Sequence, residues 1–192
     1  MARTKAFDVD TALRQAMDLF WQQGYEKTSM QNLLDHMGIH RKSLYDTFGD
    51  KYALFMQAFD RYQEMRTGEI ERRVNAQTSV KAAIRCRFDM LIYREELPSQ
   101  GCFIINTAVE LAVHDEQIAQ KVKDHFKQTE QRFYRQILQG QQLGEFSAAL
   151  DALQIAQYLT NASVGLRVMV KITDDVKKLE RIVDTTLKVL EE

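Results

Sequence analysis

The sequence predicts an all-α fold of about nine helices. Apolar side chains recur three or four residues apart along most of the chain, which is the spacing of one helix face. No segment shows the sustained alternation of apolar and polar residues that a half-buried strand needs. The only proline is Pro98, so nothing in the sequence interrupts long helices elsewhere. A chain of 192 residues is long enough for one large domain or two small ones.

The first part of the chain carries three apolar stripes with helical spacing. They cover residues 13–20, 30–37 and 55–62. A glycine follows the first two stripes, at Gly24 and Gly38, where a helix commonly ends on a residue with positive φ. Gly49 gives a third such ending. We therefore expect three short helices and a longer fourth between residues 8 and about 73.

Start signals alternate with these endings. Thr28 and Gln31 have the spacing of a capping box, and Asp50 precedes the fourth helix. Polar breaks follow at residues 75–79 and 98–101. Later stripes predict a helix of about five turns over residues 118–137 and two more helices over residues 153–170 and 179–190.

Composition is that of an ordinary globular protein, with 45% hydrophobic and 28% charged residues. No apolar run is long enough to span a membrane, and the basic N-terminus has no apolar stretch behind it, so a cytoplasmic protein is expected. The net charge is −1, and the first 52 residues hold seven basic and seven acidic side chains. The strong basic charge typical of a nucleic-acid binder is missing, so that function must be argued from pattern.

The pattern is a helix-turn-helix. The helices predicted over 29–37 and about 41–47 are joined only by Gly38-Ile39-His40, and two short helices with such a turn form this DNA-binding motif. Its second helix enters the major groove with its N-terminal residues at the base edges. The first turn of this second helix reads His40-Arg41-Lys42-Ser43, and these side chains can bond to base edges.

The other residues of the second helix have separate roles. Leu44 and Phe48 are one turn apart and should hold this helix against the preceding one. Side chains off that stripe suit phosphate contacts, which position a protein without reading sequence. The residues predicted to contact DNA are Thr28, Ser29, His40, Arg41, Lys42, Ser43, Tyr45, Thr47 and Lys51.

The stretch from Phe7 to Phe59 resembles the DNA-binding domain of the TetR family of transcription regulators, of the AcrR-like type. The resemblance is strongest over TSMQNLLDHMGIHRKSLYDTFGDKYALF. The family features are a small pair before the second helix, a Gly-apolar-polar turn, a Leu-Tyr-x-x-Phe block and a following Lys. They stand here as Thr28-Ser29, Gly38-Ile39-His40, Leu44-Tyr45-Asp46-Thr47-Phe48 and Lys51, preceded by Gly24-Tyr25. His40 departs from the pattern, because the family more often has Ser or Thr as the cap.

The resemblance implies the organisation and function of the whole chain. Residues 6–66 would form the DNA-binding domain, with the motif at about 29–48, and residues 75–192 a domain for ligand sensing and dimerisation. Two chains would pair through the last two helices, for which the apolar stripes at the chain end are the sequence signal. The homodimer would bind a palindromic operator in double-stranded DNA, as a repressor that an unknown small-molecule inducer or a redox signal releases. Neither a membrane nor a cofactor is implied.

Aromatic side chains of the second domain have two interpretations, plain core or lining of a sensing pocket, which needs an apolar cavity with a few polar groups. The pocket candidates are Phe88, Tyr93, Phe103, Asn106, Glu110, Phe126, Phe133 and Tyr158.

The two cysteines, Cys86 and Cys102, have no disulfide or zinc spacing and are expected to be thiols. One interpretation is that both are small buried side chains. The other makes Cys102 a redox sensor, because it lies where the 98–101 loop passes into a helix whose dipole lowers a thiol pKa. The run from Gly101 to Ala108 is also similar to one found in a subgroup of the family. Against a sensor, no Lys or Arg is closer in sequence than Arg94.

Other classes of function have weaker support. Glu110 and His114 lie one helical turn apart beside Asp115 and Glu116, but no second cluster completes a metal site, so no metal is expected. The nucleophile elbow, the H-E-x-x-H motif and the phosphate-binding glycine loop are all missing, so the chain is not expected to be an enzyme. A helical enzyme and a helical adaptor that binds no DNA are the alternatives.

Overall fold

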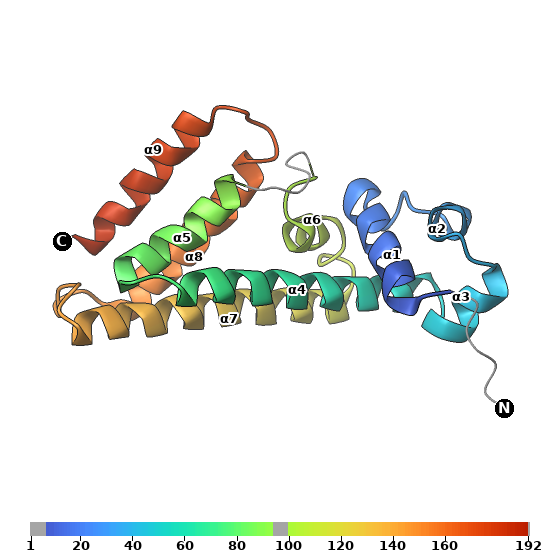
Figure 1. Cartoon of the computed structure of the whole chain (residues 1–192), viewed down its shortest axis with the longest axis horizontal. Helices are drawn as coiled ribbons and strands as arrows, with labels where there is room; N and C mark the ends of the chain where they lie inside the picture. Colours follow the sequence, from blue (N-terminus) through green and yellow to red (C-terminus); the bar gives the residue numbers. More distant parts are fainter. Residues whose placement is uncertain (1–6, 94–99, 192) are drawn as a thin grey trace. The chain divides into compact units, whose positions relative to one another are not determined.

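The computed structural model of the chain describes residues 7–93 and 100–191, and it confirms the all-α fold class. Every regular element in these two ranges is helical, with nine α-helices and one short 3-10 helix. None of the helices there is long and apolar enough to cross a membrane. The chain forms two compact units, residues 1–67 and 68–192, and each is considered by itself (Figure 1).

The first unit contains α1 (Val9–Gln23), α2 (Met30–Met37), α3 (Arg41–Phe48) and most of α4 (Lys51–Asn75). The Asp8 side chain accepts the backbone N–H of Thr11 at 2.6 Å and so caps α1, and this bond lowers the pKa of the Asp8 carboxyl. Asp50 caps α4 in the same way, accepting the backbone N–H of Ala53 at 2.8 Å. The predicted start signal at Asp50 is therefore confirmed, and Asp8 supplies a cap of the same kind.

The capping box of α2 differs from the predicted one by one residue. Ser29, not Thr28, is the N-cap, and its hydroxyl accepts the backbone N–H of Asn32 at 3.1 Å. Asn32 in return accepts the backbone N–H of Ser29 at 3.0 Å. Gln31 instead donates to Asp35 at 2.8 Å. Thr28–Gln31 and Ser29–Asn32 have the same spacing, so spacing alone did not distinguish them.

An aromatic cluster forms the core of the first unit. Phe20 of α1 meets Phe55 of α4 edge to face, with ring centroids 5.1 Å apart, and Tyr25 approaches Phe55 at 5.0 Å. Trp21 and Tyr62 make a similar pair at 5.1 Å. Edge-to-face pairs of this kind add to the stability that burial alone supplies. The cluster joins α1 to α4 and leaves α2 and α3 to be held by their own buried faces.

The second unit contains the end of α4 with α5 (Val80–Ile92), α6 (Phe103–Glu110), α7 (Glu116–Gln142), α8 (Ala152–Met169), α9 (Val176–Leu187) and a 3-10 helix, Lys188–Leu190. Helix α5 packs against α7, α8 and α9. Its buried side chains, among them Ile84 and Phe88, share one apolar core with residues of those three helices. The core thus joins segments far apart in the sequence.

The apolar stripe of α9 is part of this core. Leu179, Val183 and Leu187 are buried against the same cluster as Ile84 and Phe88 of α5. The α9 stripe, which was one of the two sequence signals for pairing of two chains, is thus covered within one chain, and pairing through the last two helices stays a prediction. A periodic apolar face predicts that something covers it but does not say what.

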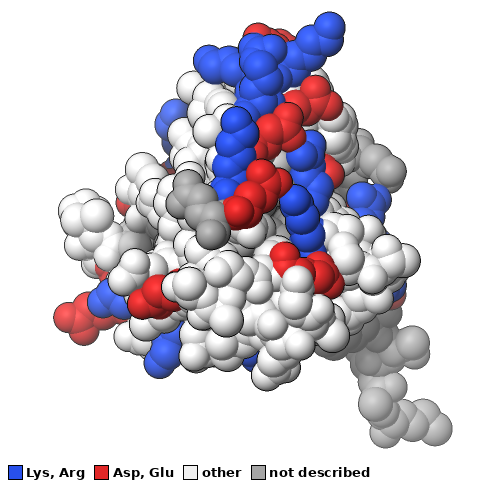
Figure 2. Space-filling view, turned by 90° about the vertical axis from the view of Figure 1, so that its left-hand side faces the viewer, with Lys and Arg blue, Asp and Glu red and all other residues white. Residues whose placement is uncertain are grey.

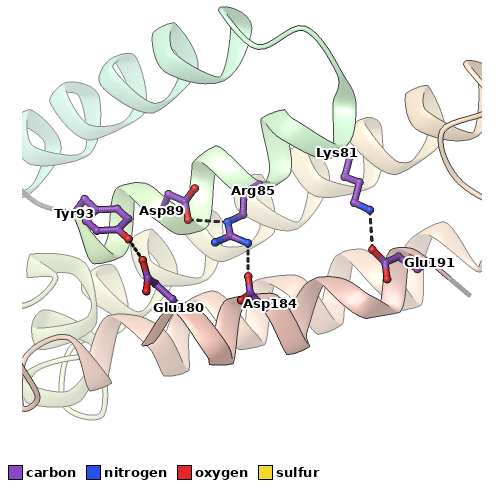
Figure 3. Close-up of polar contacts among 7 residues, drawn as sticks. All are labelled: Lys81, Arg85, Asp89, Tyr93, Glu180, Asp184 and Glu191. Carbon is purple, nitrogen blue, oxygen red and sulfur yellow. Dashed lines mark hydrogen bonds and ion pairs between the residues drawn. The ribbon is translucent and has the colours of Figure 1, made fainter. Parts of the chain in front are cut away.

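Polar contacts reinforce the packing of α9 on α5 (Figure 3). Lys81 bonds to Glu191 at 2.7 Å, Arg85 to Asp184, and Tyr93 to Glu180. In the face that Figure 2 shows, rows of Lys and Arg adjoin rows of Asp and Glu in the upper part, over α9 and α5. These pairs are largely exposed, so each contributes little energy, and they chiefly set which residues of the two helices lie opposite each other.

In the turn after α7, the side chain of Phe146 packs directly against the backbone of Gly140. Gly140 lies in the last turns of α7, and the backbone N–H groups of Glu145 and Phe146 both donate to its carbonyl. The ring of Phe146 is buried against Gly140, where a Cβ atom would lie 2.1 Å from Cδ2 of the ring. Any side chain at position 140 would therefore displace Phe146 from the core.

We predict that Gly140→Ala destabilises the protein by about 1–3 kcal/mol, the usual cost of forcing extra volume into a packed site. The matched control is Gly68→Ala in α4, where a Cβ atom meets nothing within 4 Å. That substitution should add about 0.5–1 kcal/mol of stability, because alanine favours a helix. Urea unfolding of both variants tests this. A Gly140→Ala protein as stable as the Gly68→Ala protein would contradict the packing described here.

Candidate nucleic-acid interface

The turn between α2 and α3 is short and closed by backbone bonds. Gly38 ends α2 in the left-handed conformation, with φ 62°, and its N–H donates to the carbonyl of Leu34. Ile39 donates to the same carbonyl at 3.3 Å, and its side chain is buried. The chain then begins α3 at His40, whose carbonyl accepts the N–H of Leu44 at 3.1 Å. Two helices joined by such a turn form the predicted helix-turn-helix.

Helix α3 has a buried face and an exposed face. Leu44 is 0% exposed and Phe48 is 3% exposed, so both belong to the core of the first unit. Tyr45 is 46% exposed, and Arg41 and Lys42 are exposed as well. Positions 44 and 48 are four apart and share the buried face, whereas position 42 lies on the opposite side of the helix and position 45 to one side of the buried face. Arg41 is exposed in the first turn of α3. The exposed face therefore carries two cationic side chains and one phenol.

The start of α3 is open to an anion. His40 occupies the N-cap position and makes no side-chain cap hydrogen bond, which fits its departure from the usual Ser or Thr. The backbone N–H groups of the first turn consequently receive no acceptor from the cap residue. A phosphate oxygen can supply one, and the helix dipole favours it there.

The end of α3 is held by α4. Gly49 takes a φ of 83°, and its N–H donates to the carbonyl of Tyr45. The Gln57 amide donates to the carbonyl of Phe48 at 3.0 Å and to that of Ala53 at 3.2 Å. Sequence reasoning missed Gln57, because a polar residue on the exposed side of a predicted helix gives no sign that it caps the helix before it.

Thr28 is not part of the exposed surface. Its side chain is 0% exposed, and its hydroxyl donates to the carbonyl of Gly24 at 2.6 Å. The prediction that Thr28 contacts DNA is therefore corrected: this hydroxyl closes the turn between α1 and α2. Ser29 is exposed, although its hydroxyl also serves the capping box.

Lys51 has a partner within the first unit. Its ammonium lies 4.1 Å from the centre of the Tyr25 ring, a cation–π contact. Tyr25 in turn stacks on Phe20, with ring centroids 6.1 Å apart. Lys51 is the first residue of α4, so this contact joins the start of α4 to Tyr25.

The other residues predicted to contact DNA, Ser43 and Thr47, are half-buried on α3.

The residues predicted to line a sensing pocket lie in different surroundings. Phe88 and Phe133 are buried in the core of the second unit, with ring centroids 6.0 Å apart, and Phe103 is buried too. Tyr93 and Tyr158 are exposed instead. Asn106 donates to the backbone carbonyl of Gln100 at 2.9 Å, and Phe126 and Glu110 are half-buried. Phe88 and Phe133 belong to the apolar core of the second unit, and helical spacing alone does not separate core residues from pocket lining.

Cys102 is buried, and it has a cationic neighbour that the sequence did not reveal. It is the N-cap residue of α6, and its Sγ lies 3.2 Å from Nη1 of Arg167 on α8. Residues 94–99, including Arg94 and Pro98, lie outside the described residues. Burial, together with Arg167 and Arg132, lowers the pKa of nearby His125 to about 4, so this imidazole is neutral at neutral pH. Burial also raises the pKa of the half-buried Cys86 thiol.

The acidic and histidine side chains after α6 do not form a cluster. Helix α6 ends at Glu110, so His114 lies in the following turn rather than one helical turn away on the same face. Asp115 caps α7 by accepting the N–H of Ile118 at 2.9 Å. In the part of the chain that the structure describes, no three His, Cys, Asp or Glu side chains come together as metal ligands would.

Comparison with known proteins covers nearly the whole chain. Residues 12–58 match the family described as bacterial regulatory proteins, tetR family, and residues 76–186 match the tetracyclin repressor-like C-terminal domain. The chain is 38% identical over 194 residues to the HTH-type transcriptional regulator YezE of Bacillus subtilis, spanning 100% of both proteins. It is 31% identical to the HTH-type transcriptional repressor ComR of Escherichia coli, over 97% of this chain and 90% of ComR.

A solved structure agrees in fold. The TetR family regulator CifR, in a cysteine-substituted form bound to 26-base-pair operator DNA, superposes with a TM-score of 0.87 at 25% identity, covering 97% of this chain and 98% of CifR. Matches to both domains and whole-length relatives thus agree with the helix-turn-helix built above. The chain belongs to the TetR family of DNA-binding transcription regulators.

Proposed function

We propose that the chain is a repressor that binds a palindromic operator as a homodimer, with α3 in the major groove. The observation that carries this proposal is the division of α3 into a face held by Leu44 and Phe48 and a face that exposes Arg41, Lys42 and Tyr45. Support for the operator comes from the complex of CifR with operator DNA, and support for repression from the similarity to ComR. In a two-fold dimer the two copies of α3 would lie about 34–36 Å apart, one turn of the duplex.

The exposed residues divide into two roles. Arg41 and Lys42, at the start of α3, reach base edges, where guanine O6 and N7 accept from such side chains, and the half-buried Ser43 can join them. Tyr45, Thr47 and Lys51 contact phosphates, as does Ser29 at the start of α2. His40 leaves the first-turn N–H groups of α3 to a phosphate. Thr28 has no part in the proposal.

Two chains pair through α8 and α9 in this proposal. Leu153, Tyr158 and Val168 are exposed on α8, and turns of 100° per residue place them on one side of the helix. Ile172, just beyond α8, is 79% exposed. A row of large apolar side chains left in water is a signal of an interface. The apolar contact therefore comes from α8, while α9 adds a charged border.

The signal acts by changing the separation of the two copies of α3. Helix α4 is a single helix that starts in the first unit and ends in the second, so it is the covalent path between DNA binding and sensing. A ligand that fits one arrangement better shifts the population toward it by as much as its affinity differs between the two. An inducer that binds the second unit would release the operator in this way.

A redox or electrophilic signal at Cys102 is the second candidate. The observation that favours it is the guanidinium of Arg167 at 3.2 Å from Sγ, because a cation stabilises the reactive thiolate. The burial of Cys102 opposes it, since a reagent must first reach the sulfur. Replacing Cys102 distinguishes a reacting thiol from a reversible ligand, because only a reacting thiol needs the sulfur atom.

For the reading face we predict that Arg41→Ala costs about 1–3 kcal/mol of operator affinity and relaxes base preference. Lys51→Ala should weaken binding to operator and random DNA alike and reduce the salt slope by about one unit. Fluorescence anisotropy on both duplexes over a range of salt concentrations separates the two effects. If both variants lost equal affinity on operator and random DNA, the assignment of reading and positioning residues would be wrong.

For the pairing face we predict that Val168→Glu converts the dimer to a monomer at micromolar concentration, because it puts a charge into an apolar contact. Val113→Glu is the matched control, since Val113 is exposed but lies on neither α8 nor α9. Sedimentation equilibrium gives the mass of each protein. A dimeric Val168→Glu protein, or an unmodified protein that is already monomeric, would refute pairing through α8.

For the thiol we predict that peroxide or a quinone releases DNA from the unmodified protein and from Cys86→Ser, but not from Cys102→Ser. Cys86 should be inert, because burial raises its thiol pKa and lowers its thiolate fraction. A gel shift with and without reagent makes the comparison. Release from the Cys102→Ser protein, or from none of the three, would leave a reversible ligand as the signal and Cys102 as a packing residue.

A further inference from the structure

The second unit contains a polar pocket that the proposed function does not use. It holds about 420 Å³ and lies among the end of α4, the first turns of α5 and the last turns of α7. A volume of this size is within the range of small-molecule sites. None of the aromatic residues predicted to line a sensing pocket lines it. Its lining is instead marked by three arginines, Arg87, Arg132 and Arg135.

One carboxylate serves two of these arginines. Glu71 of α4 bonds to Nη2 of Arg87 at 3.0 Å and to Nε of Arg132 at 3.3 Å. Arg87 also donates through Nε to Gln136 at 2.9 Å, and Arg135 donates to the backbone carbonyl of Gln131 at 3.2 Å. Each guanidinium has five N–H donors, so these bonds occupy only part of what the three side chains can offer.

The second carboxylate of the lining is committed elsewhere. Glu145 accepts the backbone N–H groups of Val80 and Lys81, both at 3.0 Å, and so caps the start of α5. These two bonds lower the pKa of Glu145, which keeps it charged and in place. The lining holds three arginines and two carboxylates, those of Glu71 and Glu145, so its net charge is +1.

Two of the three guanidinium groups are largely withdrawn from water, whereas Arg135 is exposed. The side chains of Arg87 and Arg132 are only 12% and 23% exposed. Burial is the main cause that lowers the pKa of Arg132. The carboxylate of Glu71 opposes this shift, and repulsion from Arg87 and Arg135 adds to it. Two largely buried cations that share the single carboxylate of Glu71, with a third cation beside them, favour the approach of a further anion.

We propose that this pocket binds a small anion through a carboxylate or phosphate group. The planar guanidinium matches both groups with paired N–H bonds, which a lysine could not do. Thr78, Gln139 and Gln136 also line the pocket and offer hydroxyl and amide groups to the rest of the ligand. Glu71 takes the position of the ligand's anionic group while the pocket is empty. The proposal does not depend on whether the chain binds DNA.

Titration calorimetry on the full chain, without DNA, tests the proposal. The probes are citrate and inorganic phosphate, each measured against sodium chloride of equal ionic strength, so that the two arms distinguish carboxylate from phosphate recognition. Binding of either probe above the chloride background is expected. Arg132→Gln should weaken it at least about tenfold, the effect of losing one charge-assisted bond. Glu71→Gln should tighten it, because the competing internal carboxylate is gone.

Arg85→Gln is the matched control. Like Arg132→Gln, it removes one positive charge from the second unit. Arg85 lies on α5, is paired with Asp89 and Asp184, and does not line this pocket. Its affinity for the probe should equal that of the unmodified protein. The proposal is overturned if neither probe binds to the unmodified protein and to Glu71→Gln, or if Arg85→Gln weakens binding as much as Arg132→Gln. Glu71→Gln is expected to bind the probe more tightly, and a misfolded protein would not do so. The Glu71→Gln result therefore tests the proposal even if Arg132→Gln fails to fold.

Discussion

The burial of Leu44 and Phe48 is the constraint on which the DNA-binding unit depends. These two apolar side chains fix the rotation of α3 about its own axis, and the rotation decides which residues face outward. Gly38 and Gly49 set where the helix begins and ends, while Gln57 ties its last carbonyl to α4. The residues that would read DNA are thus placed by residues that never touch it.

A similar division runs through the second unit. The apolar faces of α5 and α9 close a core within one chain, and the pairs Lys81–Glu191 and Arg85–Asp184 align the two helices. The surfaces available for binding are those that this core leaves uncovered. On α8 that surface is apolar, and between α4, α5 and α7 it is cationic and partly buried. A partner chain and an anion are the two kinds of occupant that such surfaces accept.

The helices were predictable from the sequence because apolar spacing and caps are local signals. Asp8 and Asp50 act within three residues of themselves. The faces of α3 were predictable for the same reason. Local signals failed where equal spacings competed, as between Thr28 and Ser29, and they do not say whether an apolar stripe is covered by the chain itself or by a partner.

Contacts between distant segments gave no sequence signal at all. Arg167 reaches Cys102 from 65 residues away, and the cation–π contact of Lys51 with Tyr25 depends on how α4 packs beside α1. The polar pocket joins Glu71 to Arg132 in the same way. Tertiary packing creates such sites, so a chain with balanced charge can still hold a local excess of positive charge.

The most direct test of the account compares Leu44→Ala with Tyr45→Phe, two neighbours on opposite faces of α3. Thermal unfolding and operator affinity are measured for both proteins. Leu44→Ala should lose about 2–5 kcal/mol of stability, the usual cost of truncating a buried leucine. Tyr45→Phe should unfold as the unmodified protein does and bind the operator more weakly, because it loses only a hydroxyl directed at phosphate. A Tyr45→Phe protein that is the less stable of the two would contradict the assigned faces of α3.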